Sequence, residues 1–165
     1  MRPTPSQTVG PFFRFGLEWL ESGQQRNAED RGTFTIFGRV LDGEGQAVPD
    51  ALVEFYQEGS PSDSGSSFYR RLVDEDGRFE VDTLMPISVD ADQAPHLDVN
   101  VFARGLMQRL VTRVYFEGQD ANRVDPILNL VHESRRQSLV AKRTDRGFEF
   151  DIRLQGDRET VFFAW

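Results

Sequence analysis

Residues 94–118 read APHLDVNVFARGLMQRLVTRVYFEG, and this stretch decides the fold because apolar residues recur at every second position along much of it. In an extended strand, side chains two residues apart share a face. Leu97, Val99 and Val101 therefore form one apolar series, and His96 and Asp98 point the same way as each other. A pair of histidines at this spacing would be a plausible half of a metal site, but the second residue here is an aspartate.

The same alternation continues on both sides of this stretch and is typical of half-buried strands. One apolar series spans residues 34–40 and a second spans 51–55, and the turn residues 42–45 between them predict a hairpin. Further runs lie at residues 79–81, 110–116 and 148–154. About seven such runs separated by turn signals predict an all-β sandwich.

Helical signals are few. Residues 17–22 end at Gly23 and predict one short helix, and Asp125 followed by Pro126 predicts the start of another. Residues 58–67 are rich in serine and glycine and predict a surface loop. We expect a single domain over residues 1–165, with an amino-terminal arm and short helix in 1–32 and the sandwich in 33–165.

The composition excludes some functions. A net charge of −8 disfavours binding to nucleic acid, which needs a concentrated basic face. No apolar run approaches the length of about 18 residues that a membrane span requires. The chain has no cysteine and its first residues lack the order of a secretory signal, so we expect a cytoplasmic protein with neither a membrane nor a nucleic acid as partner.

Five segments carry a resemblance to a known family. They are TPSQTVGPF (4–12), GRVLDGEGQAVPDALVEFYQ (38–57), APHLDVNVFARG (94–105), TRVYFEG (112–118) and ETVFF (159–163). Together, and in this order, they resemble the intradiol ring-cleaving dioxygenases, and among those the α subunits of members built from two kinds of chain. The resemblance covers nearly the whole chain and implies a transthyretin-like β-sandwich.

The family implies a non-haem ferric iron held by two tyrosines and two histidines, a donor set that suits Fe³⁺. His96 matches the first histidine of the family's H-x-H strand, and Asp98 stands where the second should be. The family's two ligand tyrosines have no counterpart, and Gln93 aligns with an arginine of iron-binding members. The resemblance therefore implies that His96 and Asp98 are vestigial, and that Fe³⁺ belongs to a partner β subunit and not to this chain.

The resemblance also implies what a metal-free chain contributes. In the family, the α subunit closes one wall of the β subunit's pocket with its amino-terminal arm and one arginine. On this sequence the positions are Thr8, Val9, Gly10, Pro11 and Arg104. Arginine can bind a carboxylate through two parallel hydrogen bonds. The implied substrates are protocatechuate, which carries such a carboxylate, and O₂. The implied product is 3-carboxy-cis,cis-muconate, and the isolated chain is expected to be inactive.

Other interpretations remain open at this stage. Arg104 could form only a surface ion pair, and the arm could be a frayed terminus. The chain could be a transthyretin-like binding or structural module without an oxygenase partner. His96, Asp98 and His132 could form a ferrous triad of two histidines and one carboxylate. The apolar residues 161–165 could pack against a partner.

Overall fold

A computed structural model describes residues 3–17, 32–59, 66–88, 90 and 92–164. Its strands are β1 (Thr33–Leu41), β2 (Leu52–Gln57), β3 (Ser67–Leu72), β4 (Arg78–Leu84), β5 (His96–Phe102), β6 (Leu110–Phe116), β7 (Val140–Thr144), β8 (Gly147–Glu149) and β9 (Ile152–Arg153). Its short helices are α1 (Phe12–Leu17), α2 (Pro126–Leu130) and α3 (Glu133–Arg136), with 3₁₀ turns η2 (Asp120–Arg123) and η3 (Gln137–Leu139). None of the helices in these residues is long and apolar enough to cross a membrane.

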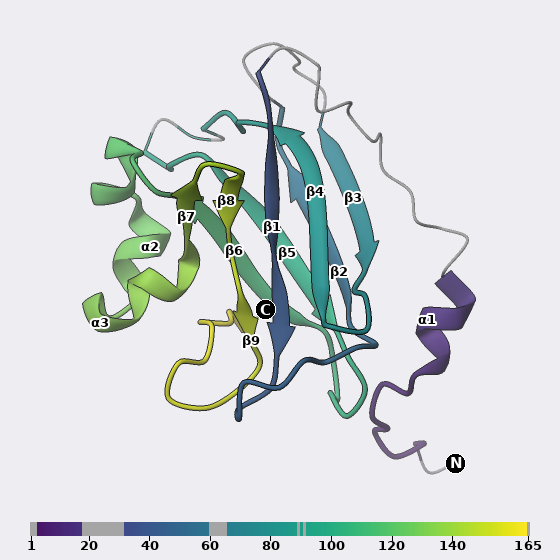
Figure 1. Ribbon diagram of the computed structural model, residues 1–165. Helices are drawn as coiled ribbons and strands as arrows, with labels where there is room; N and C mark the ends of the chain where they lie inside the picture. Colours follow the sequence, from purple (N-terminus) through teal and green to yellow (C-terminus); the bar gives the residue numbers. More distant parts are fainter. Residues whose placement is uncertain (1–2, 18–31, 60–65, 89, 91, 165) are drawn as a thin grey trace.

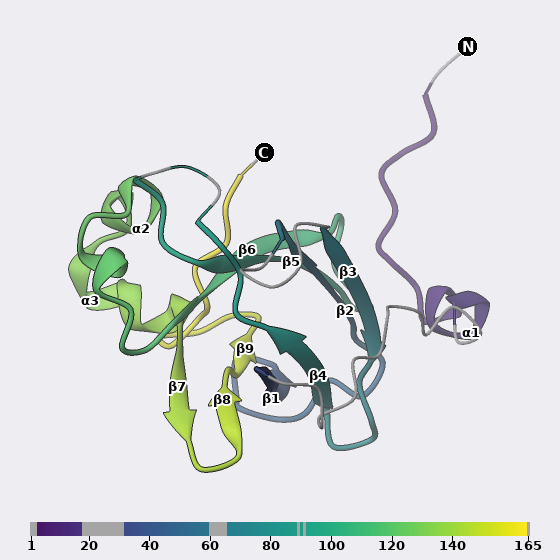
Figure 2. The ribbon, with the colours of Figure 1, turned by 90° about the horizontal axis from the view of Figure 1, so that it is seen from above.

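The strands form two layers that face each other (Figures 1 and 2). One layer has the order β3-β2-β5-β6 and the other contains β8, β1 and β4. Strand β7 joins them, because it pairs parallel to β6 and antiparallel to β8. Ile36, Val53, Phe55, Leu97 and Val99 are fully buried between the layers, so the apolar series of the sequence do face a common core. The all-β sandwich is confirmed.

The predicted hairpin between residues 34–40 and 51–55 is wrong. Strand β1 pairs with β4, whereas β2 pairs with β3 and β5 in the other layer. The turn itself forms, since Asp42 Oδ1 accepts hydrogen bonds from the backbone of Glu44 and Gln46, but only a single bridge, Leu41 to Ala47, follows it. Alternation shows which side of a strand is buried and does not identify the strand beside it. The sequence pattern therefore could not predict that the chain crosses from one layer to the other between β1 and β2.

The run 148–154 splits into β8 and β9, which both pair parallel to β1. Between them, Phe150 N donates to Phe37 O at 2.8 Å. The backbone passes so close to Gly38 that a Cβ there would lie 1.9 Å from Phe150 O. A residue with a side chain at position 38 would therefore push the two strands apart.

Asp125 and Pro126 begin a helix, as predicted, because the Asp125 side chain accepts a hydrogen bond from Leu128 N at the start of α2. The helix predicted for residues 17–22 falls outside the described residues except for Leu17, which ends α1. Most of the predicted surface loop, residues 60–65, also falls outside them.

Candidate functional site

The sequence candidates divide between the two ends of β5. His96 is the first residue of this strand and Arg104 lies two residues beyond its last, Phe102. At about 3.3 Å per residue, the six steps along β5 from 96 to 102 span about 20 Å. The structure therefore defines two separate regions, which we call the histidine end and the arm end of β5 (Figure 1).

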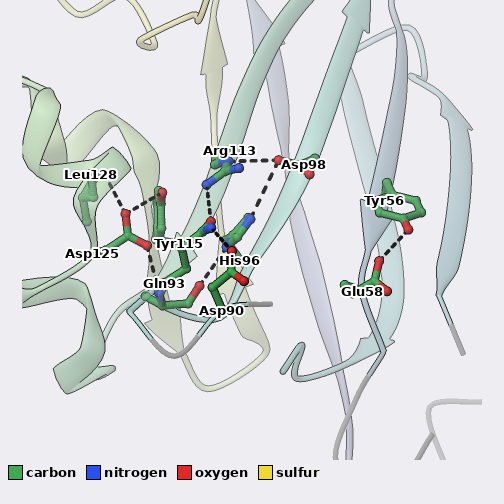
Figure 3. Close-up of polar contacts among 11 residues, drawn as sticks. Tyr56, Glu58, Asp90, Gln93, His96, Asp98, Arg113, Tyr115, Asp125 and Leu128 are labelled. Carbon is green, nitrogen blue, oxygen red and sulfur yellow. Dashed lines mark hydrogen bonds and ion pairs between the residues drawn. The ribbon is translucent and has the colours of Figure 1, made fainter. Parts of the chain in front are cut away.

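His96 is buried and already bonded at the histidine end. Its side chain is 3% exposed, and Nδ1 lies 2.7 Å from the Ala94 carbonyl oxygen. Because a carbonyl only accepts, Nδ1 carries the proton and donates. Burial lowers the pKa of His96 below its usual value of 6.5, so the neutral imidazole is favoured. Nε2 lies 3.9 Å from Asp98 Oδ1, on the outer face of the sheet (Figure 3).

Asp98 is paired with an arginine that the sequence reading did not single out. In the register of β5 and β6, Asp98 lies opposite Arg113, and Arg113 Nε donates to Asp98 Oδ1 at 3.0 Å. Arg113 also donates from a terminal nitrogen to Gln93 Oε1 at 3.0 Å (Figure 3). The guanidinium therefore places a fixed positive charge beside the one carboxylate of the H-x-D pair.

Asp125, at the start of α2, anchors the histidine end. This fully buried carboxylate accepts hydrogen bonds from Ala94 N at 2.8 Å, Leu128 N at 2.7 Å and the Tyr115 hydroxyl at 3.1 Å (Figure 3). It thus ties the segment before β5 to α2 and β6. Burial raises the pKa of Tyr115, so its phenol stays protonated. The sequence predicted Asp125 as a helix cap but not as this anchor.

The residues of the histidine end do not fit a ferric iron. Fe³⁺ favours phenolate donors, yet the Tyr115 hydroxyl keeps its proton and donates a hydrogen bond to Asp125. Tyr56, on β2 next to Asp98, donates to Glu58 at 2.6 Å, and this hydrogen bond raises the pKa of Tyr56. Asp98, the carboxylate of the pair, is held by Arg113. These side chains therefore do not supply the donors that a ferric iron needs.

The ferrous triad of His96, Asp98 and His132 is wrong. His132 is exposed at the start of α3, and its Nδ1 bonds to Ser134 Oγ at 2.9 Å. Within residues 3–17, 32–59, 66–88, 90 and 92–164, no three His, Cys, Asp or Glu side chains gather in a way that could hold a metal ion.

The arm end brings together two segments that are far apart in the sequence. Val9 N donates to Leu106 O at 2.7 Å, and Gly105 N donates to Val9 O at 3.0 Å. The arm is therefore paired to the loop that carries Arg104, while Thr8, Gly10 and Pro11 beside it are exposed. Figures 1 and 2 both draw α1 outside the sandwich, on the side of β3.

Arg104 makes an ion pair and is still open to solvent. Its Nε lies 2.5 Å from Oδ2 of Asp50, and its side chain is 60% exposed. The ion pair considered for Arg104 is thus present, although its partner is buried rather than on the surface. The turn that holds Asp50 also contacts α1, because Arg14 donates a hydrogen bond to Pro49 O. Nearby, the ring centroid of Phe13 lies 6.5 Å from that of Phe102, at the end of β5. Asp50 was not predicted, since an aspartate after proline reads as a turn former.

The architecture defines the class of protein. The dioxygenase domain of a dioxygenase carbohydrate-binding protein fusion from Streptomyces sp. SirexAA-E superposes with a TM-score of 0.61 at 23% identity, covering 80% of this chain and 86% of that one. Catechol 1,2-dioxygenase from Pseudomonas arvilla C-1 gives a TM-score of 0.60 at 18% identity, covering 80% of this chain and 55% of that one. The fold is that of the intradiol dioxygenases.

Residues 11–156 match the family described as Dioxygenase, and the chain belongs to that family. It is 38% identical to the protocatechuate 3,4-dioxygenase alpha chain of Burkholderia cepacia, covering 99% of this chain and 98% of that one. Identity to the alpha chain of Pseudomonas putida is 32%, with 97% and 95% covered. The beta chain of Burkholderia cepacia is 28% identical, with 83% and 71% covered. The sequence resemblance to an α subunit is confirmed.

Proposed function

We propose that this chain is the iron-free α subunit of a protocatechuate 3,4-dioxygenase. A β subunit holds Fe³⁺, and the αβ complex opens protocatechuate with O₂ to 3-carboxy-cis,cis-muconate in the cytoplasm, as a step of aromatic catabolism in the β-ketoadipate pathway. The observation that carries the proposal is the similarity to two α chains, which extends over nearly the full length of this chain and of each relative.

The histidine end supports the assignment of iron to the partner. Asp98 is neutralised by Arg113, and the Tyr115 phenol is committed as a donor to Asp125. Ferric binding there would require breaking both contacts and deprotonating a phenol whose pKa is raised by burial.

The arm end supports the role of a pocket wall. The backbone pairing of the half-buried Val9 holds the arm beside the loop of Arg104, and Thr8, Gly10, Pro11 and Arg104 around it are exposed. Apart from its two chain neighbours, no described residue has an atom within 4 Å of a Cβ built on Gly10, so the backbone there is open to close approach. Pro11 fixes its own φ, and Arg104 supplies a positive charge for the carboxylate of protocatechuate.

Co-expression with a β chain tests the proposal. The two chains should purify together, contain iron, show the colour of a ferric centre and consume O₂ with protocatechuate. The chain produced alone should contain no stoichiometric iron and consume no O₂, and the β chain alone is the second control.

Iron and O₂ uptake with catechols in the chain produced alone would overturn the iron-free role. A folded chain that does not associate with any β chain would instead favour the transthyretin-like binding or structural module.

A further inference from the structure

Asp50 is an unusual carboxylate because it is buried and nearly without partners. The residue is 6% exposed, in the turn between Val48 and β2. Among the residues the structure describes, neither of its oxygens accepts a well-formed hydrogen bond, and its charged neighbour is Arg104 Nε at 2.5 Å. A buried charge is costly unless an opposite charge compensates it, so the contact with Arg104 is the interaction that Asp50 depends on.

The shortest contact of Asp50 is with Nε of the arginine. Asp50 forms its ion pair with Nε, and within the described part of the chain the two terminal nitrogens of Arg104 make no hydrogen bond. A guanidinium carries its donors in a rigid plane, so fixing Nε orients the terminal pair. The side chain is 60% exposed, which leaves that pair accessible. Two parallel N–H groups of this kind match the two oxygens of a carboxylate.

The same turn also fixes the arm. Arg14 of α1 donates to Pro49 O, next to Asp50, and Gly105, next to Arg104, donates to Val9 O. The turn at residues 49–50 therefore contacts both the arm, through Arg14, and Arg104, through Asp50, so it fixes the position of one relative to the other.

We propose that Asp50 is a positioning residue for carboxylate recognition: it holds Arg104 by Nε so that the terminal nitrogens face the carboxylate of the catechol substrate. This inference rests on the proposed function. An arginine held in place loses less conformational entropy on binding than a free one, so the pairing increases affinity for the carboxylated substrate.

The test uses the αβ complex and two substrates, protocatechuate and catechol, which differ by the carboxylate. The measured quantity is the ratio of kcat/KM for protocatechuate to that for catechol. Asp50→Asn removes the charge at nearly constant size and should lower this ratio about tenfold, mainly through KM for protocatechuate. Arg104→Ala should lower it at least as much. The double variant should match Arg104→Ala, because Asp50 acts through Arg104.

The matched control is Asp120→Asn. Asp120 forms an ion pair with Arg123 at 3.6 Å, but both side chains are more than four-fifths exposed and the pair lies in η2, after the other end of β6. This variant should keep the substrate ratio of the unmodified complex.

The three variants distinguish the role of Asp50 from that of Arg104. If Arg104→Ala lowers the ratio and Asp50→Asn does not, the positioning role is overturned and the proposed function stands. If Arg104→Ala leaves the ratio unchanged, recognition of the carboxylate at the arm end fails together with the positioning role. Effects that simply add in the double variant would also overturn the positioning role.

Arg104→Lys keeps the inference testable if Asp50→Asn does not assemble. Lysine retains the charge that Asp50 needs but lacks the paired outward donors. The complex should therefore assemble normally and lose the preference for protocatechuate about tenfold. Full preference in this variant would show that the orientation of a guanidinium is not required.

Discussion

The two ends of β5 differ in how their charged groups are satisfied. At the histidine end, Asp98 and Asp125 are both bonded by neighbouring elements, and His96 is capped by a carbonyl. At the arm end, Arg104 is bonded on one side only and remains largely exposed on the other. Polar groups whose partners are all internal stabilise the chain, whereas groups that are oriented and left open are available to a ligand or partner. On the proposed function, the histidine end serves stability and the arm end serves recognition.

The largest effect that would test this contrast is expected from Asp125→Ala. The substitution leaves the amides of Ala94 and Leu128 and the Tyr115 hydroxyl without their buried acceptor. The free energy of unfolding should fall by about 3 to 5 kcal/mol. Urea unfolding followed by far-UV circular dichroism measures it, with the exposed Asp120→Asn as control. A loss below about 1 kcal/mol would mean that the anchor is not structural.

A smaller loss is expected at the arm end from Arg104→Ala, measured on the chain without its partner. Asp50 would remain buried without its cation, which should cost about 2 kcal/mol of unfolding free energy. Adding Asp50→Asn should recover part of this loss, because the buried group is then neutral. If the double variant is less stable than Arg104→Ala alone, the ion pair is not what compensates Asp50.

Arg113→Met separates charge from packing at the histidine end. Methionine fills similar space, but Asp98 loses its ion pair. Because the Asp98 side chain is 42% exposed, the free energy of unfolding should fall by only about 1 kcal/mol. The pKa of His96 should rise, because the positive charge of Arg113 is among the causes that lower it, after burial. Proton NMR titration of His96 measures this shift. An unchanged or lower pKa would contradict the arrangement in Figure 3.

The smallest expected effect is the contribution of His96 to the pH dependence of the free energy of unfolding. The pKa of His96 lies below 6.5 in the folded chain, so the unfolded chain binds the proton first as the pH falls. The contribution of neutral His96 is therefore present above about pH 6.5 and is lost progressively below it, with a slope of at most about 1.4 kcal/mol per pH unit. Urea midpoints at pH 7.5 and 5.5 should differ less in His96→Gln than in the unmodified chain. An equal difference in both would assign the pH dependence to other groups.

The sequence predicted the buried face of β5 and the cap at Asp125 because both depend on neighbours within a few residues. It failed to pair β1 correctly because alternation carries no information about the opposing strand. The Asp98 and Arg113 pair was within reach, since a hairpin folded about Gly105 places residues 98 and 113 opposite each other. The role of Asp50 could not be predicted from the sequence, because Arg104 and Arg14 are far from residues 49–50 in the chain and reach this turn only in the folded structure.

The way Val9 attaches to the loop after β5 has a consequence for variation along the arm. Both hydrogen bonds use the main chain of Val9, with one amide donating and one carbonyl accepting. Substitutions that alter only the side chain at this position would leave the attachment intact, and proline, which has no amide hydrogen, would break half of it. The side chain at position 9 can therefore vary in size and polarity while the main-chain attachment of the arm is kept.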